Sequence, residues 1–361
     1  MHPISRRTFL QGSTAIVALP AGLAACADDS AARAGIDAVP TPGGGIVPSA
    51  QFDAAGDLQV AYLQGKNVFL SQSRDAGATF AAAVRVNDRP GFAQGGLFRG
   101  PEMALDGDGG IHVVWYSGAW EMSRDKSEQG AMYARALHGA AFEASRNIGK
   151  EPSDGFSVAA RAGQVAIAWH NGELLKVVRS DDAGATFSAA TPFEALPCDC
   201  CATTLRIAPA GQTVIVYRDR KDDHRDMYVA ALDRGKTKAR RLRLDSRSWI
   251  IDACPLSGCG VVLRDEGLTA AWEHDGEILM SRVDVAAWQR SEPVALGRGK
   301  YPLVLANADR LLVAWSAGKE LAWQSLDLET MRPVGKGSVR RATSHRAAGA
   351  VSPAGRFVLI V

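Results

Sequence analysis

A strand pattern that recurs along the whole chain is the feature that most restricts how this sequence can fold. Each copy contains an alternating apolar and polar strand, a turn with Asp or Gly, a second strand that ends in an aromatic residue, and a third strand. The pattern is clear in "GPEMALDGDGGIHVVWYSG" and in "LVLANADRLLVAWSAGKELAWQSL". The copies begin near residues 46, 98, 155, 201, 258, 301 and 346. Their spacing is roughly 45–55 residues, which is the period of a repeat fold.

A repeat of this length that is built from strands predicts a β-propeller, in which each copy forms one blade of an all-β ring. Long stretches with helical periodicity are absent from the sequence, which argues against alternating strands and helices. Six copies are complete and the seventh is partial. We expect a six-bladed propeller over residues 46–361. The alternative is seven blades, in which the strands at 346–361 close the ring together with the N-terminal segment.

Two copies contain the same sharper motif, S-x-D-x-G-x-T-F, at residues 73–80 and 180–187. We expect each motif to form a rigid hairpin, because the aspartate accepts backbone N–H groups across the turn and the glycine tolerates positive φ. The phenylalanine can tuck between the strands. Weaker versions stand at residues 139–142 and at Ser281 with Trp288. The structural residues predicted in the two strict motifs are Ser73, Asp75, Gly77, Thr79, Phe80, Ser180, Asp182, Gly184, Thr186 and Phe187.

These two motifs resemble the Asp-box (BNR) repeat of sialidase-like β-propellers, and the resemblance covers most of residues 46–361. It implies that the boxes are structural hairpins away from the functional face. It also implies that the loops before the first strand and after the second strand of each blade share one face. In sialidases that face holds the active site. The expected fold is therefore an all-β, sialidase-like propeller with six blades, or with seven.

The N-terminus has the features of an exported lipoprotein. The stretch "SRRTFL" contains an arginine pair and precedes a short apolar run, as in twin-arginine (Tat) signal peptides. The stretch "LAAC" resembles a bacterial lipobox, in which Cys26 would be lipidated. We expect residues 1–26 to be a Tat signal peptide and residues 27–45, rich in Ala, Asp, Pro and Gly, to be a flexible tether. The expected location is the periplasm, on either the inner or the outer membrane.

The balance of charges excludes one class of partner. The chain has 41 Lys and Arg residues against 39 Asp and Glu residues, a formal net charge of +2, and no basic stripe. Nucleic acid is therefore not an expected partner. We expect a monomer that is attached to the membrane through its lipid anchor.

Several reactive side chains map to the face that the resemblance makes functional. Arg99 and Tyr301 stand near the first strands of their copies, while Arg218 and Glu273 follow second strands. The resemblance to sialidases implies a nucleophilic tyrosine with a glutamate partner, and arginines that hold the substrate carboxylate. Tyr301 would be the nucleophile with Glu273 beside it, and Arg99 and Arg218 would bind the anion. The first copy departs from the family pattern, because Ile46 stands where sialidases have an arginine and no acid aspartate is evident.

An aromatic residue ends the second strand of nearly every copy. These residues are Trp115, Trp169, Tyr217, Trp272 and Trp315. A repeated packing position is one interpretation. The polar residue that follows each aromatic varies, as it would around a ligand-binding rim. The exit "YRDRKDDHRDMY" is unusually charged, and it is either a solvated loop or part of the functional face.

Five cysteines remain once Cys26 is set aside, and they fall into the loops "PCDCCATTL" and "DACPLSGCG" of adjacent copies. Two disulfides between these loops and one spare thiol are one interpretation for an oxidising compartment. A copper or zinc site is a second, because thiolates bind both metals. A redox-active thiol pair is a third. The candidate metal ligands are Cys198, Cys200, Cys201, Cys254, Cys259, His170, His224 and His274.

Three functional hypotheses follow from these patterns. The first is a periplasmic lipoprotein of the sialidase family that binds or hydrolyses a glycan or another small anionic ligand at the central face. The second is a protein that binds copper or another thiophilic metal, or performs redox chemistry, through the two cysteine loops. The third is an interaction scaffold without catalysis. One fold hosts many functions, so the sequence leaves all three open.

Overall fold

The computed structural model describes residues 31–32, 34–119, 125–195, 197–236, 238–265, 267–341 and 343–361. The expected signal peptide at 1–26 and the lipidation site Cys26 lie outside these residues. Across the described part of the chain, no helix has the length and apolar character needed to cross a membrane.

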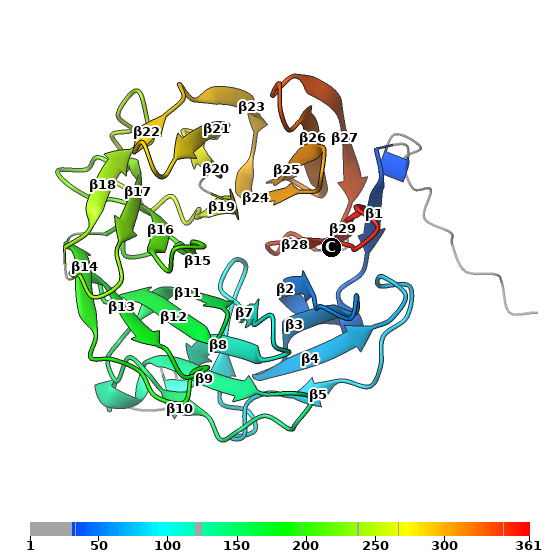
Figure 1. Cartoon of the computed structure of the whole chain (residues 1–361), viewed down its shortest axis with the longest axis vertical. Coiled ribbons are helices and arrows are strands. Elements are labelled where there is room, and N and C mark those ends of the chain that lie inside the picture. The colour runs from blue at the N-terminus through cyan, green and yellow to red at the C-terminus, as the bar shows by residue number, and fades with distance from the viewer. Residues whose placement is uncertain are drawn as a thin grey trace, which may run out of the picture.

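The strands form seven sheets arranged as a ring around a central axis, so the protein is a β-propeller with seven blades (Figure 1). The first strand of each blade lies toward the axis and pairs with an antiparallel second strand. The expected propeller is confirmed. Of the two blade numbers considered, seven is the one that forms.

The first four blades follow one another along the chain. Blade 1 contains β2 (Ile46–Phe52), β3 (Leu58–Gln64), β4 (Asn67–Ser73) and β5 (Val84–Arg85). Blade 2 contains β6 (Ala93–Gln94), β7 (Glu102–Leu105), β8 (Ile111–Ser117), β9 (Ala131–Ala136) and β10 (Arg146–Asn147). Blade 3 contains β11 (Asp154–Arg161), β12 (Gln164–His170), β13 (Leu174–Ser180) and β14 (Thr191–Ala195). Blade 4 contains β15 (Thr204–Ile207), β16 (Thr213–Arg218), β17 (Met227–Leu232) and β18 (Arg240–Arg243).

The last three blades complete the ring. Blade 5 contains β19 (Cys259–Arg264), β20 (Gly267–His274), β21 (Glu277–Asp284), β22 (Gln289–Arg290) and β23 (Val294–Arg298). Blade 6 contains β24 (Lys300–Ala306), β25 (Arg310–Ala317), β26 (Glu320–Asp327) and β27 (Pro333–Arg340). Blade 7 contains β28 (Ala348–Val351), β29 (Phe357–Ile360) and β1 (Ile36–Val39). Short 3₁₀ turns occur at η1 (Pro42–Gly44) and η2 (Lys126–Glu128).

Blade 7 is built from both ends of the described chain. β1 runs parallel to β29, with Ile36 opposite Phe357 and Val39 opposite Ile360. Ile36 is only 3% exposed and packs in one apolar cluster with Phe357 and Leu359. The expectation of a flexible tether through residue 45 is therefore wrong for β1, because its backbone and apolar side chains complete the last sheet.

The aromatic residues at the ends of the second strands are packing residues, as one interpretation predicted. Trp115, Trp169, Tyr217 and Trp272 are buried almost completely, and Trp315 nearly so. Trp272 of β20, for example, lies in an apolar cluster with side chains of β16 and β17 in the preceding blade. Each aromatic residue thus fills the space between two blades, and its burial supplies part of the hydrophobic free energy that holds the ring together.

The polar residues that follow these aromatics are also buried, and several of them reach the next blade. The Tyr116 hydroxyl donates to Asp154 Oδ1 at 2.7 Å, which links blades 2 and 3. Arg218 Nη2 donates to the carbonyl oxygen of Glu273 at 2.7 Å, which links blades 4 and 5. The type of polar residue differs from blade to blade because each one makes a different hydrogen bond between neighbouring blades. The variation therefore does not indicate a ligand-binding rim.

The two S-x-D-x-G-x-T-F motifs form hydrogen-bonded turns, as expected. Ser73 Oγ donates to Asp75 Oδ1 at 2.7 Å and accepts the Gly77 N–H at 2.7 Å. Asp75 accepts the backbone N–H of Thr79 at 2.8 Å and its hydroxyl at 2.6 Å. Residues 180–187 repeat all four hydrogen bonds at 2.6–2.9 Å. The turns join the third and fourth strands of blades 1 and 3, so they stabilise the outer part of each blade rather than the channel.

The closure of the ring gives a first prediction. Ile36→Ala should lower the free energy of unfolding by about 2–5 kcal/mol, because it removes a buried side chain from the sheet that joins the two ends. Chemical denaturation followed by tryptophan fluorescence measures the change. Asp37→Ala is the matched control, since it removes only a partly exposed ion pair with Arg356 and should cost less than about 1 kcal/mol. Equal effects of the two substitutions would contradict this role of β1.

The turn motifs predict a response to acid. Hydrogen bonds from the Thr79 hydroxyl above all lower the pKa of Asp75 from 3.8 to about 2, and those from Ser180 and Thr186 lower the pKa of Asp182 further. A folded pKa below the unfolded value means that each carboxylate stabilises the fold above pH 3.8 and loses this contribution as the pH falls toward 2.

The double variant Asp75→Asn, Asp182→Asn should therefore unfold at a lower urea concentration at pH 7 and show a flatter decline between pH 4 and pH 2 than the parent protein. Urea midpoints across this pH range measure both effects. Glu320→Gln, the same loss of charge outside the turns, is the control. Parallel acid profiles for the double variant and the parent protein would contradict the prediction.

Candidate functional site

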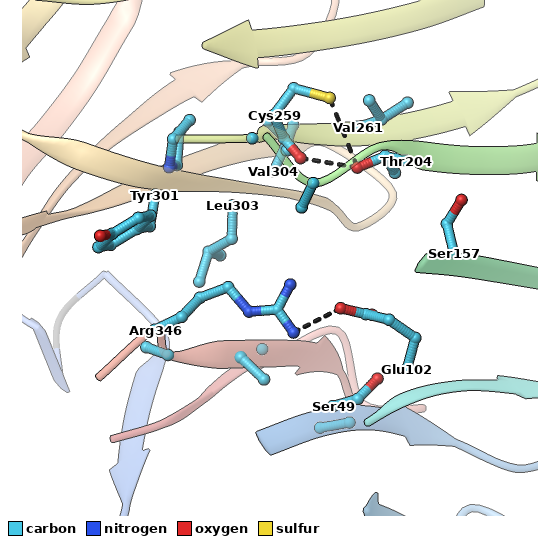
Figure 2. Close-up of a pocket in the computed structure, with 18 of the residues that line it drawn as sticks. Ser49, Glu102, Ser157, Thr204, Cys259, Val261, Tyr301, Leu303, Val304 and Arg346 are labelled. Atoms are coloured by element: carbon cyan, nitrogen blue, oxygen red, sulfur yellow. Dashed lines mark hydrogen bonds and ion pairs between the residues drawn. The ribbon is translucent and has the colours of Figure 1, made fainter. Parts of the chain in front are cut away.

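The first strands of the blades surround a central channel with a cavity of about 170 Å³ (Figure 2). Its wall has polar side chains from five blades: Ser49, Glu102, Ser157, Thr204 and Arg346. The starts of these strands form one mouth of the channel, and their ends form the other. Hydroxyl and charged groups in a concave site suit a polar ligand.

An ion pair lies in the channel wall. Arg346 Nη2 is 2.5 Å from Glu102 Oε1, and it joins the segment before β28 to β7 (Figure 2). The Nε of Arg346 is buried and has no hydrogen-bond partner among the described residues. A buried N–H without an acceptor costs free energy, so this guanidinium is suited to a ligand that brings an acceptor with it.

Tyr301 lies at the mouth of the channel and lines the same cavity as Arg346, whose guanidinium extends away from the Tyr301 ring toward Glu102 (Figure 2). The ring stacks on Phe98, with centroids 5.9 Å apart and an angle of 16° between the planes. Its backbone has a φ of 53°, a sparsely populated conformation for this residue type, and its N–H donates to Ser257 Oγ at 3.3 Å. Burial, and then the Glu273 carboxylate, raise the pKa of Tyr301, so the phenol is neutral near pH 7.

Both arginines of the predicted catalytic set donate hydrogen bonds to acceptors within the protein. Arg99 donates through Nε and Nη2 to the Asp154 carboxylate at 2.9 and 2.5 Å. Arg218 is 1% exposed, and it donates to the carbonyl oxygens of Arg225 and Glu273, both at 2.7 Å. The Glu273 carboxylate is close enough to raise the pKa of Tyr301, while neither arginine presents a free guanidinium to a ligand.

A further charged group on this face is the Glu273 carboxylate. It is 3.9 Å from Lys300 Nζ, and its Oε2 is buried without a hydrogen-bond partner among the described residues. Lys300 also donates to the carbonyl oxygen of Pro255 at 3.1 Å, so it joins the start of β24 to the loop before β19.

Among the residues of this face that sequence reasoning missed are Asp154 and Arg346. Asp154 receives the Arg99 guanidinium and the Tyr116 hydroxyl, and Arg346 pairs with Glu102. Both stand at or just before the first strand of a copy, the position by which Tyr301 was chosen. That position was the available signal, but nothing in the sequence showed which partner each side chain would meet.

Four of the cysteines meet at the same end of the propeller. Cys200 and Cys254 form a disulfide with Cα atoms 6.4 Å apart. The Sγ atom of Cys198 lies 3.1 Å from that of Cys201 and 3.5 Å from that of Cys200. We call these four residues the sulfur cluster. The interpretation of two disulfides is wrong for the described cysteines, because only one forms and Cys198, Cys201 and Cys259 are free thiols.

The free thiols differ in their surroundings. A hydrogen bond with Cys201 above all lowers the pKa of Cys198 to about 7, and the charges of Arg218 and Arg225 act in the same direction. Burial raises the pKa of Cys201. Cys259 lies apart in the channel wall, 3.5 Å from Thr204 Oγ1, and burial raises the pKa of its thiol to about 11 (Figure 2).

The histidines proposed as ligands have other contacts. His170 Nε2 is 3.2 Å from the carbonyl oxygen of Cys201. His224 Nδ1 hydrogen-bonds to Ser248 Oγ. His274 Nδ1 is 2.8 Å from Asp245 Oδ1.

The group of potential metal ligands that the described residues bring within 4.8 Å of one another contains no histidine. Its members are Cys198, Asp199, Cys200 and Cys254. Asp199, which sequence reasoning did not select, is exposed and pairs with Arg220 at 2.8 Å. The sulfur atoms are therefore the ligands that this end of the propeller offers to a metal.

Comparison with known proteins supports the fold but does not show which chemistry the site performs. No protein-family model and no curated protein matches the sequence. The chain is similar to the solved structure of Kuenenia stuttgartiensis hydrazine synthase, with a TM-score of 0.57, 12% identity, and coverage of 88% of this chain and 92% of that chain. A polysaccharide lyase, the PL25 ulvan lyase, matches with a TM-score of 0.56, 12% identity, and coverage of 85% and 87%.

A third similar structure is the leech intramolecular trans-sialidase, complexed with 2,7-anhydro-Neu5Ac. It matches with a TM-score of 0.54, 10% identity, and coverage of 80% of this chain and 68% of that chain. At these identities the likeness is one of fold alone. The expected sialidase-like propeller is therefore confirmed as an architecture, and its ligand is a separate question.

The arrangement of the cysteines predicts the result of disulfide mapping. Protein purified in air, alkylated while denatured and digested without reduction should contain a linked pair of peptides with Cys200 joined to Cys254. Cys259 should be alkylated in the same sample, which serves as the internal control because its thiol lies outside the sulfur cluster. Mass spectrometry measures both. A link between Cys198 and Cys201 in place of the Cys200–Cys254 link would contradict the assignment.

Proposed function

We propose that this protein binds a glycan with an acidic group, or another small anionic ligand, at the mouth of its central channel. We also propose that it acts in the periplasm, exported through a Tat signal and held to a membrane by a lipid on Cys26. The single observation that carries the ligand proposal is that the stacked Tyr301 and Phe98 rings and the Arg346 side chain line one concave site.

Each part of this mouth suits one part of an acidic sugar. A sugar ring has apolar C–H faces that can lie against an aromatic ring, and Tyr301 presents its ring toward the cavity (Figure 2). A guanidinium recognises a carboxylate or sulfate through its N–H groups. Arg346 is the arginine at this position, and because its Nη2 already pairs with Glu102, an anionic ligand would bind through the N–H groups that Glu102 leaves. The hydroxyls of Ser49, Ser157 and Thr204 can exchange hydrogen bonds with sugar hydroxyls further along the channel.

The same geometry favours binding over hydrolysis of the sialidase type. That reaction needs an activated tyrosine and free arginines around the substrate carboxylate. Here Arg99 and Arg218 are held by the protein's own acceptors, so neither is free to bind the substrate carboxylate. The neighbours named as a trans-sialidase and an ulvan lyase fit a glycan ligand, but they support it through fold alone.

Titration calorimetry with a panel of neutral, carboxylated and sulfated oligosaccharides tests the proposal. An acidic member should bind, and Tyr301→Ala and Arg346→Gln should each weaken it by about tenfold or more, because each removes a contact worth roughly 1.5–3 kcal/mol. Arg161→Gln is the matched control, since Arg161 ends β11 at the opposite mouth.

Two results would reject the proposal: no binding across the panel, or binding that the Tyr301 and Arg346 substitutions leave unchanged. Incubation of the same panel with the protein, followed by analysis of released sugars, separates binding from hydrolysis. Release of sugar that Tyr301→Phe abolishes would replace the binding function with an exo-glycosidase.

A further inference from the structure

We propose that Cys198, Cys200, Cys201 and Cys254 form a site for a thiophilic metal ion, copper(I) or zinc(II), when the Cys200–Cys254 disulfide is reduced. The proposal goes beyond glycan binding and rests on residues that the ligand proposal does not use. Thiolate sulfur is the donor that these two ions prefer among protein side chains.

The spacing of the sulfur atoms fits the ligand shell of a single ion. Cys198 Sγ lies 3.1 and 3.5 Å from the sulfurs of Cys201 and Cys200, and Cys200 is bonded to Cys254. A tetrahedral ion with metal–sulfur bonds of about 2.3 Å holds its ligands roughly 3.8 Å apart. The ligand atoms of Cys198, Cys200 and Cys254 lie within 4.8 Å of one another, and the Cys201 sulfur lies 3.1 Å from that of Cys198, so Cys198 joins the three other sulfurs in one cluster. Opening the disulfide and moving the Cys201 side chain would complete a four-sulfur shell.

Backbone contacts hold the loop that supplies three of the four sulfurs. The Cys198 N–H donates to the Arg218 carbonyl oxygen at 2.8 Å. At the other end of the loop, the Thr203 hydroxyl donates to the Gly155 carbonyl oxygen at 2.7 Å. The loop is thus fixed between blades 3 and 4, and a ligand set held in place in this way loses little conformational freedom when an ion binds.

The buried charge of Arg218 is the second observation, because it favours a neighbouring cluster whose net charge is negative. Arg218 is 1% exposed, and its guanidinium donates to two backbone carbonyl oxygens and lies over the Trp249 ring. Its Nε lacks a hydrogen-bond partner, and no ion pair joins it to a carboxylate among the described residues. Its charge acts on both Cys198 and Cys201. A buried cation is costly unless a counter-charge lies near it. Four thiolates around a monovalent or divalent ion have a net negative charge, and they would provide that counter-charge.

The oxidation state of the cluster controls whether the site exists. A dithiol reductant opens the Cys200–Cys254 bond by transferring two electrons and two protons to it, and becomes a disulfide itself. The four thiols then release their protons to solvent as their sulfurs bind the ion. Re-oxidation removes two of the four ligands. The structure therefore describes the closed state of a redox-dependent site.

Anaerobic titration of the full-length protein tests this inference. Reduced protein, freed of its dithiol, is titrated with copper(I) against a chromophoric copper(I) chelator and, separately, with zinc(II) against a chromophoric zinc chelator. Elemental analysis then gives the stoichiometry. We expect one ion per chain in the reduced protein and binding at least about tenfold weaker in the oxidised protein, because loss of ligands exceeds the cost of losing an outer-shell contact. The two titrations distinguish copper from zinc.

Cys198→Ser and Cys201→Ser should each weaken binding by at least the roughly tenfold that loss of an outer-shell partner costs. Cys259→Ser is the matched control and should bind as the parent protein does, because its thiol lies in the channel wall outside the cluster. Circular dichroism and unfolding midpoints confirm that each variant is folded. Reduced protein that binds neither ion, or a Cys198→Ser and Cys201→Ser pair that bind as tightly as the parent, would overturn the proposal. Either result leaves the glycan proposal intact.

Discussion

The parallel pairing of β1 with β29 is the interaction on which the rest of the structure depends. A propeller buries its apolar surface between neighbouring blades, so an open ring would leave the faces of its first and last blades in water. Here the last sheet takes strands from both ends of the described chain, and Ile36 is buried against Phe357. Closure also brings Arg346 of the last copy beside Glu102 of the second, so the channel exists only in the closed ring.

The blades are held in register by pairs of adjacent residues on their second strands. The aromatic member fills the space between blades, and the polar member bonds to the next blade, as Tyr116 does with Asp154 and Arg218 does with Glu273. Burial of the Tyr116 hydroxyl and of the Arg218 Nη groups is tolerated because each has a specific acceptor. This arrangement also affects the chemistry of the site. Arg99 and Arg218, the arginines that a sialidase-like site would use to bind substrate, join neighbouring blades here.

Two sites of different chemistry share this end of the propeller. The channel mouth, with Tyr301, Phe98 and Arg346, offers an aromatic surface and a cation. The sulfur cluster lies close by, since an ionised Cys201 would raise the pKa of Tyr301. A charged ligand at either site would therefore interact electrostatically with the other site, and the low dielectric constant of a buried region strengthens this interaction. Cys259 contributes to the channel wall and stays outside the cluster.

The sequence by itself determined the propeller, the order of the blades and the two turn motifs. Strand alternation and turn chemistry are local, so the hydrogen bonds of Asp75 and Asp182 could be predicted from eight residues each. The resemblance to sialidase-like propellers, rather than the repeat alone, implied a shared face for Tyr301, Glu273 and the cysteine loops. Only the tertiary structure decided the seventh blade, the pairing of Cys200 with Cys254, and the loss of Arg99 and Arg218 to internal partners. These outcomes depend on which side chains from different blades meet at close range, and a one-dimensional pattern does not contain that information.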